Sequence, residues 1–302
     1  MTIWQSESWW NMLIDSHQAL KVLENNWIFI EKRKVALWEY GLFVLGLEKT
    51  INQDDINALI KICKNENVLF LQLENLNYKW VQDIWLLTQL GFKKWYYKKF
   101  LTPYTAIINL SLTDDEILAK MKPKGRYNIR LATKKWVVVK KVSKTQQNID
   151  EFYKLILETT LRDWFSWNSL DFYNKFLSNL SNSELLLAYF EDKVIAWAIF
   201  VFDQNEAIYY YWASTSNSDY RNLMAPYLLQ WEAIQLAKKF WSKYYDFLWV
   251  ATPWEKDCSL SWVTDFKLKL TPEVVNVSDS YIYTNKKFKY KIIEIIRKLR
   301  KK

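Results

Sequence analysis

The chain of 302 residues contains only four glycines, two cysteines and one histidine. Cys63 and Cys258 do not form a CxxC pair, so neither a disulfide framework nor a thiolate zinc site is indicated. The single histidine, His17, excludes most Ser-His-Asp, Cys-His and histidine-rich metal schemes, and we expect no bound metal. Any chemistry must therefore use carboxylates, lysines, tyrosines, backbone groups or the substrate itself.

Long hydrophobic runs are also missing. No stretch approaches 18 uninterrupted apolar residues, and the N-terminus lacks a basic segment followed by an apolar core, so we expect a soluble, cytoplasmic protein. The net charge of +9 and the pI near 9.2 suggest a polyanionic partner such as RNA, nucleotide phosphates or an anionic membrane face. Charge alone does not choose among these partners. The length suits two domains of ordinary size.

The shortage of glycine is matched by an excess of tryptophan. Ordinary usage would give roughly 21 glycines, whereas the chain has 18 tryptophans. Trp241 follows the helical run 228–240, and Trp136 stands between a basic helix end and the strand 137–139. Both corners favour a left-handed backbone and therefore glycine. Further tryptophans at strand ends, in polar turns or in a strand of small residues are Trp197, Trp212, Trp249, Trp254 and Trp262.

We hypothesise that the gene uses a code in which UGA specifies glycine, and that these codons are written here as tryptophan. Moving about fourteen residues from one type to the other restores average glycine content. Trp9 and Trp231 lie at apolar positions and are interpreted as real tryptophans. The alternative is an aromatic surface that stacks bases or sugars. UGG codons at Trp136, Trp212 and Trp241 would refute the recoding hypothesis.

Apolar strands alternate with helical patterns along the chain, which predicts an α/β (α+β) fold. Thr113 and Glu116 form a helix-opening pair. The two halves repeat loosely as helix, antiparallel strands, helix and strand. The predicted strands are 27–31, 35–37, 42–47, 68–73, 92–100, 105–110, 137–139, 185–190, 194–202, 207–211 and 244–250. The predicted helices are 54–63, 78–90, 114–121, 148–161, 170–179 and 228–240.

Three segments carry a resemblance to a known family. They are 121–132 (MKPKGRYNIRLA), 225–234 (APYLLQWEAI) followed by 245–247 (YDF), and 263–267 (VTDFK). Together they resemble the Fem-type (FemABX) peptidoglycan bridge transferases, and the resemblance spans nearly the whole chain. Gln5-Ser6 with Trp9, and 162–165, add weaker matches. Family glycines coincide with Trp136, Trp164, Trp197, Trp212, Trp241, Trp249 and Trp262.

The resemblance implies two N-acetyltransferase-like domains with mixed, largely antiparallel sheets flanked by helices. We place them at 1–103 plus 279–302 and at 104–278. It also implies transfer of an amino acid from aminoacyl-tRNA, with no other cofactor, to an amine of a peptidoglycan precursor. The precursor is either lipid-linked or UDP-linked. Leu13 and Asn168 replace the lysine and arginine that hold the diphosphate of soluble precursors in the family, so the choice stays open.

Two residues are candidates for catalysis. Lys267 matches the lysine of the family's F-K motif, where it would stabilise developing negative charge or contact the tRNA terminus. The alternative is a solvated lysine on a basic strand beside Lys269. Glu74 ends the strand 68–73 near a family acidic residue proposed as the base, although an exposed carboxylate at a helix start fits equally well. Asp246 is expected to cap or brace.

Candidate substrate-binding residues come from basic and aromatic segments. If 126–132 is helical, Arg126 and Arg130 share one face and can pair with phosphates; a solvated loop and helix end is the alternative. The basic cluster comprises Lys122, Lys124, Arg126 and Arg130. Tyrosines that either line a peptide channel or simply pack are Tyr210, Tyr211 and Tyr227. The tail 286–302 is predicted to be a basic amphipathic helix that contacts anionic lipid or tRNA, or else a plain packing helix.

Two other functions compete with this one. An acyl-CoA-dependent N-acetyltransferase would hold the pyrophosphate on backbone amides of a glycine-bearing loop at a helix start. The corresponding segment 221–226 has no glycine and no tryptophan, and Pro226 lacks an amide hydrogen, which disfavours coenzyme A. A non-catalytic RNA-binding module is the third interpretation, and it predicts salt-sensitive RNA binding without acyl transfer.

Overall fold

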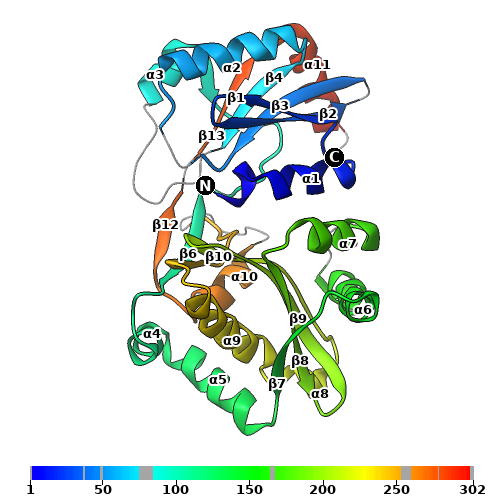
Figure 1. Ribbon diagram of the computed structural model, residues 1–302, viewed down its shortest axis with the longest axis vertical. Helices are drawn as coiled ribbons and strands as arrows, with labels where there is room; N and C mark the ends of the chain where they lie inside the picture. Colours follow the sequence, from blue (N-terminus) through cyan, green and yellow to red (C-terminus); the bar gives the residue numbers. More distant parts are fainter. Residues whose placement is uncertain are drawn as a thin grey trace. The chain divides into compact units, whose positions relative to one another are not determined.

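The computed structural model describes residues 2–36, 38–47, 50–74, 84–163, 167–252, 260–277 and 279–299. The chain forms two compact units, Met1–Pro103 with Asn276–Lys302, and Tyr104–Val275 (Figure 1). The expected division after residue 103 coincides with this one, and the second expected division, after 278, falls just beyond residue 275. Within the described residues, no helix is long and apolar enough to cross a bilayer.

The first unit is a six-stranded mixed sheet with helices. Its strand order is β1-β2-β3-β4-β13-β5, in which β3 and β4 are parallel and the other pairs are antiparallel. A capping box between Asn52 and Asp55 begins α2, which buries Ile56, Leu59 and Cys63. The elements are η1 Ile3–Gln5, α1 Glu7–Asp15, β1 Lys21–Asn25, β2 Ile28–Ala36, β3 Glu39–Leu45, α2 Gln53–Asn65, β4 Phe70–Glu74, α3 Ile84–Gln89, β5 Phe92–Lys94, β13 Ser280–Thr284 and α11 Lys287–Leu299.

The second unit is a seven-stranded sheet in the order β12-β6-β11-β10-β9-β8-β7. Strands β7 to β10 form an antiparallel meander, and β11 pairs parallel to β10. Figure 1 shows α5 and α9 on one face of this sheet and α6 and α7 on the other. The elements are β6 Tyr104–Asn109, α4 Asp114–Lys120, α5 Pro123–Lys134, β7 Val138–Val142, α6 Gln146–Asp163, α7 Leu170–Asn179, β8 Ser183–Phe190, β9 Lys193–Phe202, β10 Glu206–Ser214, α8 Ser218–Arg221, α9 Ala225–Lys239, β11 Tyr244–Asp246, α10 Ser261–Lys267 and β12 Val274–Asn276.

The predicted fold class is confirmed, but several boundaries are wrong. The strand predicted for 92–100 ends at Lys94, and β1 was not predicted. The strand predicted for 244–250 ends at Asp246, because Leu248 and Trp249 have positive φ values of 48° and 32° that interrupt the extended backbone, although the N–H groups of Phe247 and Val250 still donate to carbonyls of β6. The predicted strand 35–37 is the end of β2 rather than a separate element. The predicted helix 78–90 is observed from Ile84, and 75–83 lie outside the described residues.

The two tryptophans at helix-to-strand corners adopt the left-handed conformation that glycine prefers. Trp136 has φ 62° and Trp241 has φ 60°, and their side chains are 83% and 85% exposed. Each follows the C-cap residue of its helix, at the end of α5 and of α9. In both, the N–H of the tryptophan and that of the next residue donate to carbonyls of the last helical turn, the Schellman pattern. A bulky residue with positive φ is a genuine outlier.

Candidate functional site

The second unit contains a cavity of about 210 Å³ at the point where β10 and β11 diverge. Their parallel pairing ends at Ile208 and Asp246. Beyond this point β10 continues to Ser214, whereas the chain after β11 follows β6 as far as Val250. The cavity is lined by Ala196, Trp197, Tyr209, Trp212, Ala213, Ser214, Pro226, Leu229, Trp262, Val263 and Phe266.

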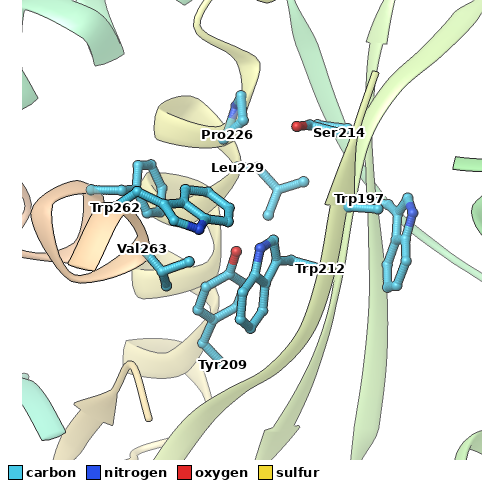
Figure 2. Close-up of a pocket in the computed structure, with 11 residues that line it drawn as sticks. Trp197, Tyr209, Trp212, Ser214, Pro226, Leu229, Trp262 and Val263 are labelled. Atoms are coloured by element: carbon cyan, nitrogen blue, oxygen red, sulfur yellow. The ribbon is translucent and has the colours of Figure 1, made fainter. Parts of the chain in front are cut away.

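Tryptophan side chains fill much of this space. Figure 2 shows the Trp212 indole from β10 and the Trp262 indole from α10 projecting into the cavity from opposite walls, with the Tyr209 ring below them. The Trp197 side chain points to the other face of the sheet, where its ring centroid lies 4.4 Å from that of Phe152. All three tryptophans are among those interpreted from the sequence as glycines, and glycine at 212 and 262 would enlarge the cavity in the cellular protein.

Lys267 is the last residue of α10 and has no exposed surface. Its Nζ donates hydrogen bonds to the carbonyls of Leu248 (2.7 Å) and Trp249 (3.2 Å). It also lies 5.2 Å from the ring centroid of Trp212, which lines the cavity. Burial lowers the pKa of Lys267 to about 7, and nearby Asp246 raises it only in part. The alternative interpretation, a solvated lysine on a strand, is therefore wrong.

Asp246 holds the chain at the point where its pairing with β10 ends. Its carboxylate is fully buried and accepts hydrogen bonds from the Thr105 hydroxyl and from the Leu248 backbone N–H (2.6 Å). These bonds fix the carbonyls to which Lys267 donates. The structure thus places Asp246 in a bracing position.

The basic cluster lies on and before α5, and 126–132 is helical as the sequence argument required. Lys122, Lys124 and Arg130 are exposed, whereas Arg126 is half-buried. Arg126 Nη1 donates to three carbonyls at the end of α4, including those of Leu118 and Ala119 at 3.3 Å. Arg126 therefore caps α4, and Arg130 is the arginine of this face that remains exposed.

Gly125 brings α5 against the segment that follows α10. A Cβ atom at this position would lie 2.1 Å from the Lys269 carbonyl oxygen. The Lys122 N–H donates to that same oxygen at 3.1 Å. The basic helix is thus fixed to the backbone just beyond Lys267.

The three candidate tyrosines occupy different places. Tyr210 and Tyr211 pack with aromatic residues of α7, notably Phe176, whose ring centroid lies 5.1 Å and 5.3 Å from theirs. Tyr227, in the first turn of α9, contacts Phe266 at 4.9 Å. Phe266 lines the cavity, so Tyr227 lies behind the cavity wall and supports it. Tyr210 and Tyr211 belong to the aromatic cluster with Phe176.

Glu74 lies in the first unit at the end of β4 and is 2% exposed. Its carboxylate accepts hydrogen bonds from the backbone of Phe100 (3.1 Å) and Leu101 (2.7 Å), and from the side chains of Gln72 (2.7 Å) and Ser280 (3.1 Å). Burial raises the pKa of Glu74 to about 7 in spite of these donors. The exposed helix-start alternative does not describe this residue, which is a buried acid poised near neutrality.

Four residues of the cavity wall were not singled out from the sequence: Ala196, Tyr209, Ala213 and Ser214. Tyr209 is 3% exposed, and burial raises its pKa well above the ordinary value. Ser214 lies beyond the predicted end of its strand at residue 211, whereas β10 continues to Ser214. The irregular register of β10, with a shift between Tyr209 and Tyr211, has no signal in the sequence.

Comparison with known proteins identifies the family. The FemAB family model matches residues 48–192 and 183–298, so the chain belongs to the FemAB family. Its members are aminoacyltransferases of peptidoglycan bridge formation. This confirms the resemblance found in the sequence. No curated protein matches the chain.

Two solved structures support the fold. The chain is similar to the crystal structure of FemX, with a TM-score of 0.81 and 17% identity over 97% of this chain and 94% of that one. It is also similar to the structure of L-PGS from Bacillus licheniformis, with a TM-score of 0.57 and 13% identity over 91% of this chain and 86% of that one. At such identities the likeness concerns the fold alone.

Proposed function

We propose that the protein transfers an amino acid from aminoacyl-tRNA to an amine of the peptidoglycan stem peptide, building the interpeptide bridge. The observation that carries the proposal is Lys267, a fully buried lysine with a pKa of about 7 beside the cavity at the β10–β11 divergence. In a FemAB family chain, such a group suits acyl transfer near neutral pH.

The reaction requires three catalytic functions. The acceptor amine must lose a proton as its nitrogen bonds to the ester carbonyl carbon. The carbonyl oxygen must be stabilised while it carries negative charge, and the ribose oxygen must gain a proton as the C–O bond breaks. The Lys267 ammonium either stabilises the negatively charged carbonyl oxygen or protonates the ribose oxygen. A glycine at residue 212 would remove the indole nearest its Nζ on the cavity side.

The exposed cations of α5 would hold the tRNA. Lys122, Lys124 and Arg130 are free to contact phosphates, and Gly125 keeps this helix against the segment after Lys267. Salt should therefore weaken donor binding. Tyr227 is proposed to support the acyl-binding wall through Phe266, and Tyr210 and Tyr211 to shape it through packing.

Glu74 is proposed as the base that accepts the amine proton. Its pKa of about 7 suits the task, but both carboxylate oxygens already accept hydrogen bonds, so the amine has to displace one of the four donors to transfer its proton. The acceptor is a lipid-linked or UDP-linked muropeptide. Because aminoacyl-tRNA is made in the cytoplasm, the reaction is placed there, at the inner membrane face if the acceptor is lipid-linked. The ester is already activated, so the proposal needs no further cofactor.

Coenzyme A as donor has less support. The start of α9, where a pyrophosphate would bind, has Met224 in a left-handed conformation and Pro226 in the first turn. The Tyr227 N–H already donates to the Met224 carbonyl (2.9 Å). This helix start therefore offers few free amides to an anion.

The test incubates the full chain with charged tRNA and either muropeptide, and follows label onto the stem peptide. We expect transfer from tRNA and none from acetyl-CoA. Lys267→Ala should lose most turnover while keeping its far-UV circular dichroism. Leu20→Ser, at a site 57% exposed in the other unit, serves as control. Absence of transfer with every amino acid and both acceptors would reject the proposal, and wild-type turnover in Lys267→Ala would remove Lys267 from it.

A further inference from the structure

Helix α11 presents an apolar stripe to solvent. Side chains along it recur at intervals of three and four residues and are 39% to 79% exposed. At 3.6 residues per turn these positions fall on one face of the helix. The stripe comprises Phe288, Ile292, Ile295, Ile296 and Leu299.

The opposite face of α11 holds the helix on the first unit. Tyr290 and Ile293 are 6% and 8% exposed, and the Tyr290 ring lies 5.5 Å from that of Phe70. Arg297 donates to the Tyr97 carbonyl (2.6 Å) and lies 3.9 Å from the Tyr97 ring centroid. One face of α11 is therefore already used for packing against the first unit. The stripe is apolar surface that this packing does not use, and packing on the first unit holds the helix in place without it.

Positive charge flanks the stripe. Segment 286–302 contains nine lysines and arginines and one acidic residue, Glu294. Lys287 and Lys291 lie on one side of the stripe and Lys289 on the other, and all three are exposed. Lys289 also pairs with Glu39 (2.7 Å). An apolar stripe with cations beside it is complementary to a surface with acyl chains at its centre and anionic headgroups at its margins.

We infer that α11 docks the protein on an anionic membrane surface, with the stripe in the acyl boundary and the flanking lysines among the headgroups. RNA would use the cations but not five exposed apolar side chains. The inference stands on α11 alone and does not depend on the transferase activity. If the acceptor is lipid-linked, the same contact holds the enzyme at its substrate.

The experiment measures co-sedimentation of the full chain with phosphatidylcholine vesicles, with and without phosphatidylglycerol. We expect binding to the anionic vesicles that weakens in high salt, and little binding to neutral ones. Phe288→Ser combined with Leu299→Ser changes the two most exposed positions and should weaken binding roughly tenfold or more. Lys287→Glu combined with Lys291→Glu should also weaken vesicle binding, because it reduces the electrostatic attraction to anionic lipid and leaves the apolar stripe unchanged.

A matched control carries Leu20→Ser and Tyr127→Ser, which remove exposed apolar side chains elsewhere (57% and 62% exposed) and should bind normally. Thermal melts verify that each variant is folded. Failure to bind anionic vesicles overturns the inference, as does binding that the stripe variant leaves unchanged. It is equally overturned if the stripe variant abolishes a dimer seen in sedimentation velocity, or if it weakens binding of tRNA.

Discussion

Replacing Trp136 and Trp241 by glycine should stabilise the second unit. Both residues hold left-handed backbone at the C′ position of a helix, and both side chains are more than four-fifths exposed, so truncation loses little buried surface. The left-handed conformation costs an L-residue about 1–2 kcal/mol. Relief of this cost stabilises the glycine variant, but glycine also gives the unfolded chain more conformational freedom, which reduces the stabilisation by about 0.4–1 kcal/mol. We therefore expect a net gain of roughly 0.5–1 kcal/mol per site.

The two sites close different helices, so their effects should add. For a unit of this size, each kcal/mol raises Tm by about 2–4 °C, so the double variant should melt roughly 2–8 °C higher. Differential scanning calorimetry measures the shift.

Alanine at the same two positions is the matched control. It removes the indoles but keeps the Cβ atom, and should gain little. Trp231→Gly is the opposite control, because this residue lies within α9 and packs against the core. It should destabilise by about 1 kcal/mol or more. Equal melting of the glycine and alanine variants would refute the backbone argument, and tryptophan in peptides from the source cell would refute the recoding hypothesis.

Three further predictions concern the site. Trp212→Gly should raise the transfer rate by opening the cavity toward Lys267, whereas Trp212→Phe should not; a fall in both sinks the idea of an occluding indole. The lowered pKa of Lys267 means that the folded state binds fewer protons than the unfolded one between pH about 7 and the ordinary value near 10.4. Stability should therefore rise with pH across this window, transfer that uses the ammonium should decline through pH about 7, and Lys267→Met should show neither trend. The raised pKa of Glu74 has the reverse sign, so stability should fall as pH rises from the ordinary value near 4.3 to about 7. Urea melts of Glu74→Gln should lack that slope and show a loss of about 1–3 kcal/mol, because its amide must face a donor; a variant as stable as wild type would contradict the hydrogen-bond assignment.

The sequence predicted elements whose signals are local. The capping pair Thr113 and Glu116 begins α4 through a capping box, and α7 has the predicted bounds. The positive φ expected at Trp136 and Trp241 also rested on local rules of helix termination.

The site was less predictable because it depends on contacts distant in sequence. Lys267 lies on a helix, and its environment is made by carbonyls near residue 248 and rings from β10, neither of which follows from spacing. Arg126 and Arg130 have the spacing of a phosphate-binding face, but the Arg126 guanidinium donates its hydrogen bonds to carbonyls at the end of α4 instead. Only tertiary packing decides between such partners.

The contact at Gly125 links two parts of the second unit mechanically. Because no side chain separates residue 125 from the Lys269 carbonyl, the position of α5 and that of the chain beyond α10 depend on each other. A side chain added at residue 125 should therefore displace both α5 and the segment that follows Lys267, because the new Cβ would lie 2.1 Å from the Lys269 carbonyl oxygen.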